Sequence, residues 1–361
     1  MEKCNVGIVG VGNISGIYLD NLTSRFSDRV NLMGCADIVP DRASAATKER
    51  ELPKSYDTVK SLINDPEIDI VLNLTIPNAH FEICLEAIEA GKHTYVEKPL
   101  SIGLDDGRKL VDEAKKRGVR LGGAPDTFLG GGIQTCRKII DDNWIGRPVA
   151  ATAFLAGHGH ESWHPDPEFY YKSGGGPMFD MGPYYLTALI NLMGPVKRIT
   201  GSTQITFPER VITSKPKHGT RIQVEIPTHI AGVMDFHNGA VATIITSFDV
   251  WGHNLPCIEI YGTEGTLSVP DPNGFGGPVR MKRHDAEEWS TMPFTHGNIE
   301  NSRGLGVADM AESIRSGAPH RASGELTYHV LECMHGFHIA SDSGRHYELE
   351  SPGIRPEPLA N

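Results

Sequence analysis

Short apolar segments alternate with amphipathic segments along the first third of the chain. Brief runs rich in β-branched residues and bounded by turn residues predict strands at 6–9, 30–36, 70–74, 94–96 and 120–123. The segments 81–90 and 105–117 have helical periodicity, and each ends at a glycine, Gly91 or Gly118. Strands that alternate with glycine-terminated helices predict βαβ units in a doubly wound parallel sheet.

The pattern changes after about residue 124. A helical segment at 184–193 ends at Gly194 and Pro195, and the alternating segments after it predict strands at 196–206, 229–236, 240–248, 258–261 and 266–269. His-Asn-Gly and Thr-Glu-Gly turns between these strands favour hairpins. Helical periodicity returns at 305–315 and 326–341, before a proline-rich end. These features predict a mainly antiparallel sheet with helices on one face.

We therefore predict an α/β protein in three parts. Residues 1–124 would form the doubly wound domain, residues 125–345 an α+β domain with an open, mainly antiparallel sheet, and residues 346–361 a tail. The C-terminal helices are expected to pack back on the first domain. The length of 361 residues suits two domains, since one domain takes about 150 residues.

Composition and charge narrow the classes of partner. The chain has 34 basic and 45 acidic side chains, a net charge of −11, and no basic run, so nucleic acid is not expected as a partner. It lacks an uninterrupted apolar stretch long enough to cross a bilayer, so we expect no membrane partner. Six scattered cysteines without a C-x-x-C pair indicate a reduced compartment. The first strand follows Met1 too closely for a secretory signal, so we expect a cytoplasmic protein.

A glycine-rich turn, Gly-Val-Gly-Asn-Ile-Ser-Gly at 10–16, follows the first predicted strand and opens a helix. Glycines there let the backbone approach a pyrophosphate, and the helix N-terminus attracts the anion. Ser15 replaces the third glycine of G-x-G-x-x-G, and a small residue still permits helix–strand packing. The alternative is a tight turn without a ligand. We expect a dinucleotide cofactor held by Gly10, Gly12, Asn13 and Ile14.

An acid, Asp37, ends the second predicted strand. Its carboxylate would accept the ribose hydroxyls and repel a 2′-phosphate, which favours NAD over NADP. Arg42 follows closely and is a second candidate contact, because a guanidinium could reach a phosphate. The alternative for Asp37 is an N-cap of the next helix, a role for which Asp41 competes.

Glu97, Lys98 and Pro99 follow a predicted parallel strand, at the edge where open α/β sheets bind ligands. Proline holds the preceding lysine extended and allows a cis bond. A lysine beside NAD could donate to a substrate hydroxyl oxygen. The alternative is an exposed ion pair between Glu97 and Lys98.

The glycine turn, the acid after the second strand, Pro77-Asn78-Ala79-His80 and Glu97-Lys98-Pro99 together resemble the Gfo/Idh/MocA family of sugar and polyol oxidoreductases. The resemblance covers nearly the whole chain and implies a Rossmann domain followed by an open-sheet domain. It implies that the segment 76–78 lines the cofactor. The further cofactor contacts expected on this basis are Thr75, Pro77, Asn78, His80, Glu97 and Lys98.

Members of the family that resemble inositol dehydrogenase carry D-x-x-x-H on a helix of the second domain. Here the aspartate is Asp180 and the histidine position holds Tyr184, as in members that resemble glucose–fructose oxidoreductase and dimeric dihydrodiol dehydrogenase. A spacing of four places both side chains on one helical face if Pro183 does not break the turn.

The resemblance implies a catalytic set of Lys98, Asp180 and Tyr184. In this hypothesis Tyr184 accepts the hydroxyl proton, Lys98 polarises the oxygen and favours the phenolate, and Asp180 orients the sugar. The amine and the phenol would converge on one alcohol that faces the nicotinamide. Two alternatives stay open: Lys98 carries the proton, or Tyr184 is a packed helix aromatic.

The segment 157–172 is rich in histidine, tyrosine and acidic residues. A sugar needs directional polar groups and an aromatic face, so we expect substrate contacts from His158, His160, Trp163 and Tyr171. The alternative is a rim loop that packs on a neighbouring subunit. Three histidines on a loop do not establish convergent ligands, so we expect no metal.

The leading interpretation is an NAD-dependent dehydrogenase that acts on a secondary hydroxyl of a sugar, glycoside or cyclitol. A second is a redox-neutral enzyme that uses bound NAD for transient oxidation, and a third is a non-catalytic dinucleotide-binding regulator. Beyond the carbohydrate or polyol substrate, we expect the chain to pair with itself as a homodimer or homotetramer, because an exposed apolar sheet must be covered.

Overall fold

The computed structural model describes residues 3–360 and divides them into two compact units. The first unit comprises the described residues up to Leu129 together with Glu300–Tyr328. The second comprises Gly130–Ile299 together with the described residues from His329 onward, so the division falls within the helix α9 (Gly324–Ser343). Each unit has its own sheet.

The first unit contains a six-stranded sheet in the order β3-β2-β1-β4-β5-β6. Its strands are β1 (Cys4–Val9), β2 (Val30–Ala36), β3 (Lys54–Ser55), β4 (Ile70–Asn73), β5 (His93–Val96) and β6 (Leu121–Gly123). Every neighbouring pair is parallel, which confirms the predicted doubly wound sheet. The strand order reverses between β1 and β4, and ligands of such sheets bind at the carboxyl ends of the strands on either side of this point.

The helices of the first unit are α1 (Ser15–Thr23), α2 (Pro40–Glu49), α3 (Val59–Ile63), α4 (Pro77–Glu89), α5 (Leu104–Arg117), α8 (Leu305–Ser316) and the short η1 (Thr127–Leu129). Helix α5 ends at Gly118, whose φ of 68° is the left-handed conformation that glycine adopts without strain. Helix α4 begins at Pro77, earlier than the predicted residue 81. Proline is well suited to the first helical turn because its missing N–H would have no partner there.

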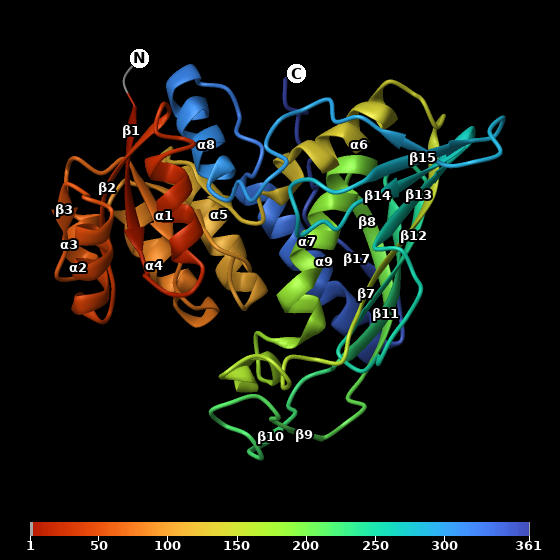
Figure 1. Cartoon of the computed structure of the whole chain (residues 1–361), viewed down its shortest axis with the longest axis horizontal. Coiled ribbons are helices and arrows are strands. Elements are labelled where there is room, and N and C mark those ends of the chain that lie inside the picture. The colour runs from red at the N-terminus through yellow and green to blue at the C-terminus, as the bar shows by residue number, and fades with distance from the viewer. Residues whose placement is uncertain (1–2, 361) are drawn as a thin grey trace. The chain divides into compact units, whose positions relative to one another are not determined.

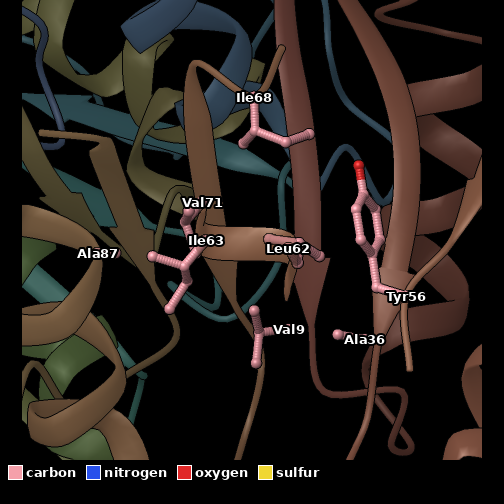
Figure 2. Close-up of a cluster of buried hydrophobic side chains, with 8 residues drawn as sticks. All are labelled: Val9, Ala36, Tyr56, Leu62, Ile63, Ile68, Val71 and Ala87. Atoms are coloured by element: carbon pink, nitrogen blue, oxygen red, sulfur yellow. The ribbon is translucent and has the colours of Figure 1, made fainter. Parts of the chain in front are cut away.

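A buried apolar cluster, shown in Figure 2, fills the space between α3 and the sheet. Its members are Val9, Ala36, Tyr56, Leu62, Ile63, Ile68, Val71 and Ala87. Gly7 in β1 makes this packing possible, since a Cβ at that position would lie 2.8 Å from Leu62 Cδ2. The cluster supports the carboxyl ends of β1 and β2, where the glycine turn begins.

The second unit contains a nine-stranded sheet in the order β16-β15-β14-β13-β7-β12-β11-β8-β17. Its strands are β7 (Pro148–Ala156), β8 (Val196–Gln204), β11 (His229–Phe236), β12 (Val241–Ser247), β13 (Ile258–Gly262), β14 (Gly265–Val269), β15 (Val279–Arg283), β16 (Ser290–Met292) and β17 (Tyr347–Glu348). Only β7 and β12 pair in parallel among these strands, so the predicted mainly antiparallel sheet is confirmed.

The pattern along the chain did not reveal β7, although this strand lies in the middle of the sheet. Its sequence, Pro-Val-Ala-Ala-Thr-Ala-Phe-Leu-Ala, is rich in alanine, which has low strand propensity and little contrast between the two faces. Burial between β12 and β13 overrides this weak local preference.

The helices α6 (Gly131–Asp141) and α7 (Gly176–Met193) and most of α9 lie along one side of this sheet (Figure 1). Close packing of α9 depends on Gly232 in β11, where a Cβ would lie 2.4 Å from Phe337 Cδ1. A two-stranded ribbon of β9 (Glu209–Val211) and β10 (Arg221–Gln223) and the short helix η2 (Pro167–Tyr171) belong to the same unit.

The last residues of the chain are fastened to the second unit. Strand β17 pairs with β8, and the Arg137 guanidinium donates to the carbonyl oxygen of Pro356 at 2.8 Å. The segment Glu300–Tyr328 belongs to the first unit. There the Asp126 carboxylate accepts hydrogen bonds from the N–H groups of Gly304 and Gly306. Across residues 3–360 no helix combines the length and the apolar character that a membrane crossing requires.

Candidate active site

The glycine turn in the first unit has the backbone that the sequence predicts. Gly10 has a φ of +96°, and a Cβ there would lie 2.9 Å from the backbone nitrogen of Thr75. A Cβ on Gly12, by contrast, would meet nothing within 4 Å. Ser15 is 3% exposed, and its hydroxyl donates to the carbonyl oxygen of Gly12 at 2.7 Å. Ser15 therefore stabilises the turn through a hydrogen bond that a glycine at this position could not make.

Asp37 is buried at the end of β2 and holds two loops together. Its Oδ2 accepts the N–H of Val11 at 2.7 Å and its Oδ1 accepts the N–H of Val39 at 2.8 Å. The alternative role as an N-cap is wrong, because the N-cap of α2 is Val39, and no side chain caps the helix there. A carboxylate has about four acceptor positions, so ribose hydroxyls would still find acceptors on Asp37.

The ends of β4 and β5 are joined by His80. Its Nδ1 lies 2.6 Å from the carbonyl oxygen of Pro99 and its Nε2 lies 3.0 Å from that of Thr75. The side chain is fully buried, and burial lowers the pKa of His80. The ring thus positions the loops expected to line a cofactor. Asn73 also fixes the loop that carries Thr75, because its Oδ1 accepts hydrogen bonds from the N–H and the hydroxyl of Thr75 at 3.2 and 2.6 Å.

Glu97 is buried beneath the loop that carries Lys98. Its Oε1 accepts the hydroxyl of Tyr18 at 2.7 Å and its Oε2 accepts the N–H of Lys98 at 2.9 Å. The alternative of an exposed ion pair is wrong, because Glu97 is only 8% exposed. Burial, together with the neighbouring Glu97 carboxylate, raises the pKa of Tyr18 well above its usual range. The bond between Lys98 and Pro99 is cis.

These groups fit a dinucleotide. The turn leaves room beside Gly12, no side chain caps the N-terminus of α1, and Asp37 follows β2. Two exposed apolar side chains, Ile38 at 93% and Ile76 at 69% exposure, follow the ends of β2 and β4. Ile76 belongs to the segment 76–78 expected to line the cofactor, whereas the sequence pattern did not single out Ile38. Both apolar side chains suit packing against the flat face of a nucleotide base. The signal in the sequence for Ile38 is its position directly after Asp37, the acid that follows β2. Asn13, Asn78 and Arg42 are exposed, and Ile14 and Pro77 are half-buried.

In the second unit, α7 continues unbroken through Pro183. Asp180 and Tyr184, four residues apart, therefore lie on the same face of the helix. Tyr184 is 8% exposed, whereas the Asp180 side chain is 15% exposed. The condition that the sequence interpretation placed on Pro183 is satisfied.

The structure brings His160 to Asp180. The His160 Nε2 lies 3.3 Å from Asp180 Oδ2. The His160 ring is stacked on Tyr170, with centroids 3.7 Å apart and an interplanar angle of 9°. A loop histidine and a helix carboxylate thus meet, although nothing in their spacing along the chain indicates it.

A buried ion cluster anchors the same loop. Arg210 in β9 lies 2.9 Å from Glu161 Oε1, also pairs with Asp249, and donates to the carbonyl oxygen of Phe248 at 2.8 Å. The side chains of Arg210, Glu161 and Asp249 are 5%, 9% and 6% exposed. The sequence pattern did not identify this cluster, because its members come from three separate segments without a shared periodicity.

The other predicted substrate residues differ in their surroundings. Tyr171 has no exposed surface, and its hydroxyl donates to Glu161 Oε2 at 2.6 Å. Burial is the main cause that raises the pKa of Tyr171, so its observed role is structural. The His158 ring stacks on Trp251 with centroids 3.3 Å apart, and Trp163 is 62% exposed. Both remain candidates for contact with a ring-shaped ligand.

Within the described residues, no group of three or more histidine, cysteine, aspartate or glutamate side chains could hold a metal ion. The histidines of the segment 157–172 contact aromatic rings and carboxylates individually. The six cysteines are free thiols.

Two family models match the chain. Residues 4–123 match the model described as an oxidoreductase family with an NAD-binding Rossmann fold, and residues 133–268 match the GFO/IDH/MocA C-terminal domain. A 1,5-anhydro-D-fructose reductase from Ensifer adhaerens is 30% identical over 268 residues, which cover 72% of this chain and 74% of that protein. A myo-inositol 2-dehydrogenase from Thermotoga maritima is 26% identical over 264 residues, covering 73% and 74%.

Solved structures share the fold. A levoglucosan dehydrogenase in complex with NADH and L-sorbose matches with a TM-score of 0.83 and 20% identity, over 97% of this chain and 99% of that chain. An NAD-binding oxidoreductase from Klebsiella pneumoniae matches with a TM-score of 0.84 and 21% identity, over 96% and 98%. Together with the family models and the sequence relatives, the glycine turn, the Glu-Lys-Pro segment and the paired sheets show that this chain belongs to the Gfo/Idh/MocA family of oxidoreductases.

Proposed function

We propose that the protein is an NAD-dependent dehydrogenase that transfers a hydride between a secondary hydroxyl of a sugar, glycoside or cyclitol and the nicotinamide. The observation that carries the proposal is the α7 face on which Asp180 and Tyr184 lie together, with His160 beside Asp180. A carboxylate, a phenol and an imidazole on one surface supply directional groups for a polyhydroxylated substrate.

The first unit would hold the cofactor through the turn that contains Gly10 and Gly12 and through Asp37. When bound, NAD supplies the hydride acceptor or donor. The Asp37 carboxylate favours NAD over NADP, because a 2′-phosphate beside it would be repelled. His80 and Glu97 act indirectly, by fixing the loops that carry Thr75 and Lys98.

Each catalytic side chain has a distinct task in this proposal. Tyr184 takes the proton from the reacting hydroxyl, Lys98 donates to the same oxygen, and Asp180 orients a neighbouring hydroxyl. An ammonium donor would stabilise the negative charge that develops on the oxygen as its proton leaves. Exposed Trp163 and the His158–Trp251 stack would contact the apolar face of the substrate ring.

The proposed substrate class is based on the names of two sequence relatives. They are named as a myo-inositol 2-dehydrogenase and a 1,5-anhydro-D-fructose reductase, and both names denote cyclic polyhydroxylated compounds. We propose a substrate of this kind for the present chain.

The test is a panel of sugars, glycosides and inositols, each with NAD and with NADP, followed by absorbance of the reduced cofactor. We expect substrate-dependent formation of NADH with at least one cyclic polyol. Turnover of a glycoside without accumulation of NADH would instead indicate a redox-neutral enzyme, and cofactor binding without any turnover would indicate a regulator.

Two variants identify the proton acceptor. Tyr184→Phe should lower kcat by about 100-fold or more, the usual contribution of one positioned acid or base. If Tyr184→Phe keeps a near-normal kcat while Lys98→Met abolishes it, the proton passes to Lys98 and the assignment of Tyr184 is wrong.

A further inference from the structure

The loop histidine His160 is held against Asp180 from several directions. Its Nε2 lies 3.3 Å from Asp180 Oδ2, and the two side chains are 13% and 15% exposed. One face of the ring is stacked on Tyr170, and Phe248 meets it edge-on, with centroids 4.8 Å apart at 80°. The orientation of the ring is therefore set by aromatic packing from two separate segments.

The backbone around His160 is also fixed. Its carbonyl oxygen accepts the N–H groups of Trp163 and His164 at 3.3 and 2.9 Å, and its own N–H lies 3.4 Å from the hydroxyl of Tyr171. The next residue, Glu161, belongs to the buried ion cluster with Arg210. Since both the ring and the backbone are restrained, the contact with Asp180 is a built feature of the loop.

The two ring nitrogens of His160 have different surroundings. Nε2 faces the Asp180 carboxylate, whereas Nδ1 is buried and has no hydrogen-bond partner among the described residues. A proton on Nδ1 would bury a donor without an acceptor, which is costly. The neutral ring is therefore expected to carry its proton on Nε2, the nitrogen that faces an acceptor.

We propose that His160 is a positioning residue for Asp180, and that through this carboxylate it sets the affinity for a hydroxylated substrate. The proposal rests on the proposed function, in which Asp180 orients a substrate hydroxyl. His160 pairs with one oxygen of the carboxylate and so restricts its rotation. An orienting contact of this kind is present in the bound substrate and in the transition state alike, so its loss raises KM more than it lowers kcat.

The titratable groups on the elements packed against His160 are Asp180 on α7, Tyr170 on η2, His164 on the loop, and the ion cluster of Glu161, Arg210 and Asp249. Within the cluster, Arg210 pairs with both carboxylates. Asp180 is the carboxylate that lies against His160, 3.3 Å from its Nε2.

The experiment compares His160→Phe with His164→Phe. Phenylalanine keeps an aromatic ring at either position, and His164 contacts the rings of Trp163, Phe169 and Tyr170 on the same loop. We expect His160→Phe to raise KM about tenfold, because the Asp180 carboxylate loses the polar group that faces it, with kcat changed less than about twofold. His164→Phe should leave KM within about twofold of the wild type.

Two further outcomes would overturn the proposal. If His160 acts through Asp180, adding His160→Phe to Asp180→Asn should change KM by less than about twofold, whereas a full tenfold increase in that background would refute the coupling. A rise in KM of the same size in His164→Phe would show a merely structural role for the ring.

A measurement without turnover separates this proposal from the proposed function. Nitrogen-15 NMR of the histidine rings at pH 8 should show that the His160 ring is protonated on Nε2. The His160 signal is assigned as the one that disappears in His160→Phe. This signal should change in Asp180→Asn. An unchanged signal overturns the pairing even if the enzyme is active. A changed signal in a protein that turns over no member of the panel supports the pairing and refutes the proposed function.

Discussion

Replacing Arg210 by methionine should destabilise the second unit strongly. The guanidinium is 5% exposed and pairs with two carboxylates, those of Glu161 and Asp249, which are 9% and 6% exposed. Methionine retains much of the volume but leaves both carboxylates buried without a counter-charge. Breaking a buried pair in this way typically costs about 3–5 kcal/mol.

The loss of stability in Arg210→Met is increased further because methionine cannot make the other contacts of Arg210. Arg210 donates to the carbonyl oxygens of Phe248 and His158 at 2.8 and 3.2 Å, and its guanidinium carbon lies 4.9 Å from the centre of the Phe207 ring. We therefore expect a loss at the upper end of the range, near 5 kcal/mol.

The assay is urea unfolding at pH 7, with a matched control and a rescue. Arg198→Met removes an ion pair with Asp235 whose side chains are 42% and 24% exposed, so it should destabilise the protein far less than Arg210→Met. The triple variant Arg210→Met, Glu161→Gln, Asp249→Asn leaves no buried charge and should recover more than half of the loss. A cost below about 1 kcal/mol for Arg210→Met, or a triple variant less stable than the single one, would refute the reasoning.

Three other predictions concern separate parts of the chain. Asp37→Ser should lower the ratio of kcat/KM for NAD over that for NADP by about tenfold or more, because it removes the repulsion of a 2′-phosphate; steady-state kinetics with both cofactors measures it. Burial raises the pKa of Asp126 from 3.8 to about 6. Between about pH 4 and pH 6 the folded state therefore binds more protons than the unfolded state, so the free energy of unfolding falls as the pH rises through this range. Unfolding of the wild type and of Asp126→Asn across that range should show a relative loss of about 3 kcal/mol in the wild type, and parallel curves would contradict it. Gly232→Ala should cost about 1–3 kcal/mol in thermal or urea unfolding, because its Cβ would lie 2.4 Å from Phe337 Cδ1, and Phe337→Leu should relieve part of that cost.

Local patterns were sufficient to predict every strand of the first sheet except β3, whose two residues are not buried. The other strands are mainly buried apolar runs, and the helices α4 and α5 are followed by Gly91 and Gly118; such signals depend only on residues close together in the sequence. The same holds for the glycine turn, the acid Asp37 and the spacing of Asp180 and Tyr184 on α7. Alternating segments likewise predicted β8, β11, β12, β13 and β14 of the second sheet, and the two hairpin turns indicated the pairs β11–β12 and β13–β14.

Tertiary contacts decided the remainder. Strand β7 forms between β12 and β13, where Ala151 and Ala153 are buried, and the enclosed Tyr171 donates its hydroxyl to Glu161. The contact between His160 and Asp180 and the cluster around Arg210 join segments whose sequences carry no common period. Side chains from distant segments meet only when the backbone has folded, and for this reason the pattern along the chain can identify the residue types of a site but not their pairing.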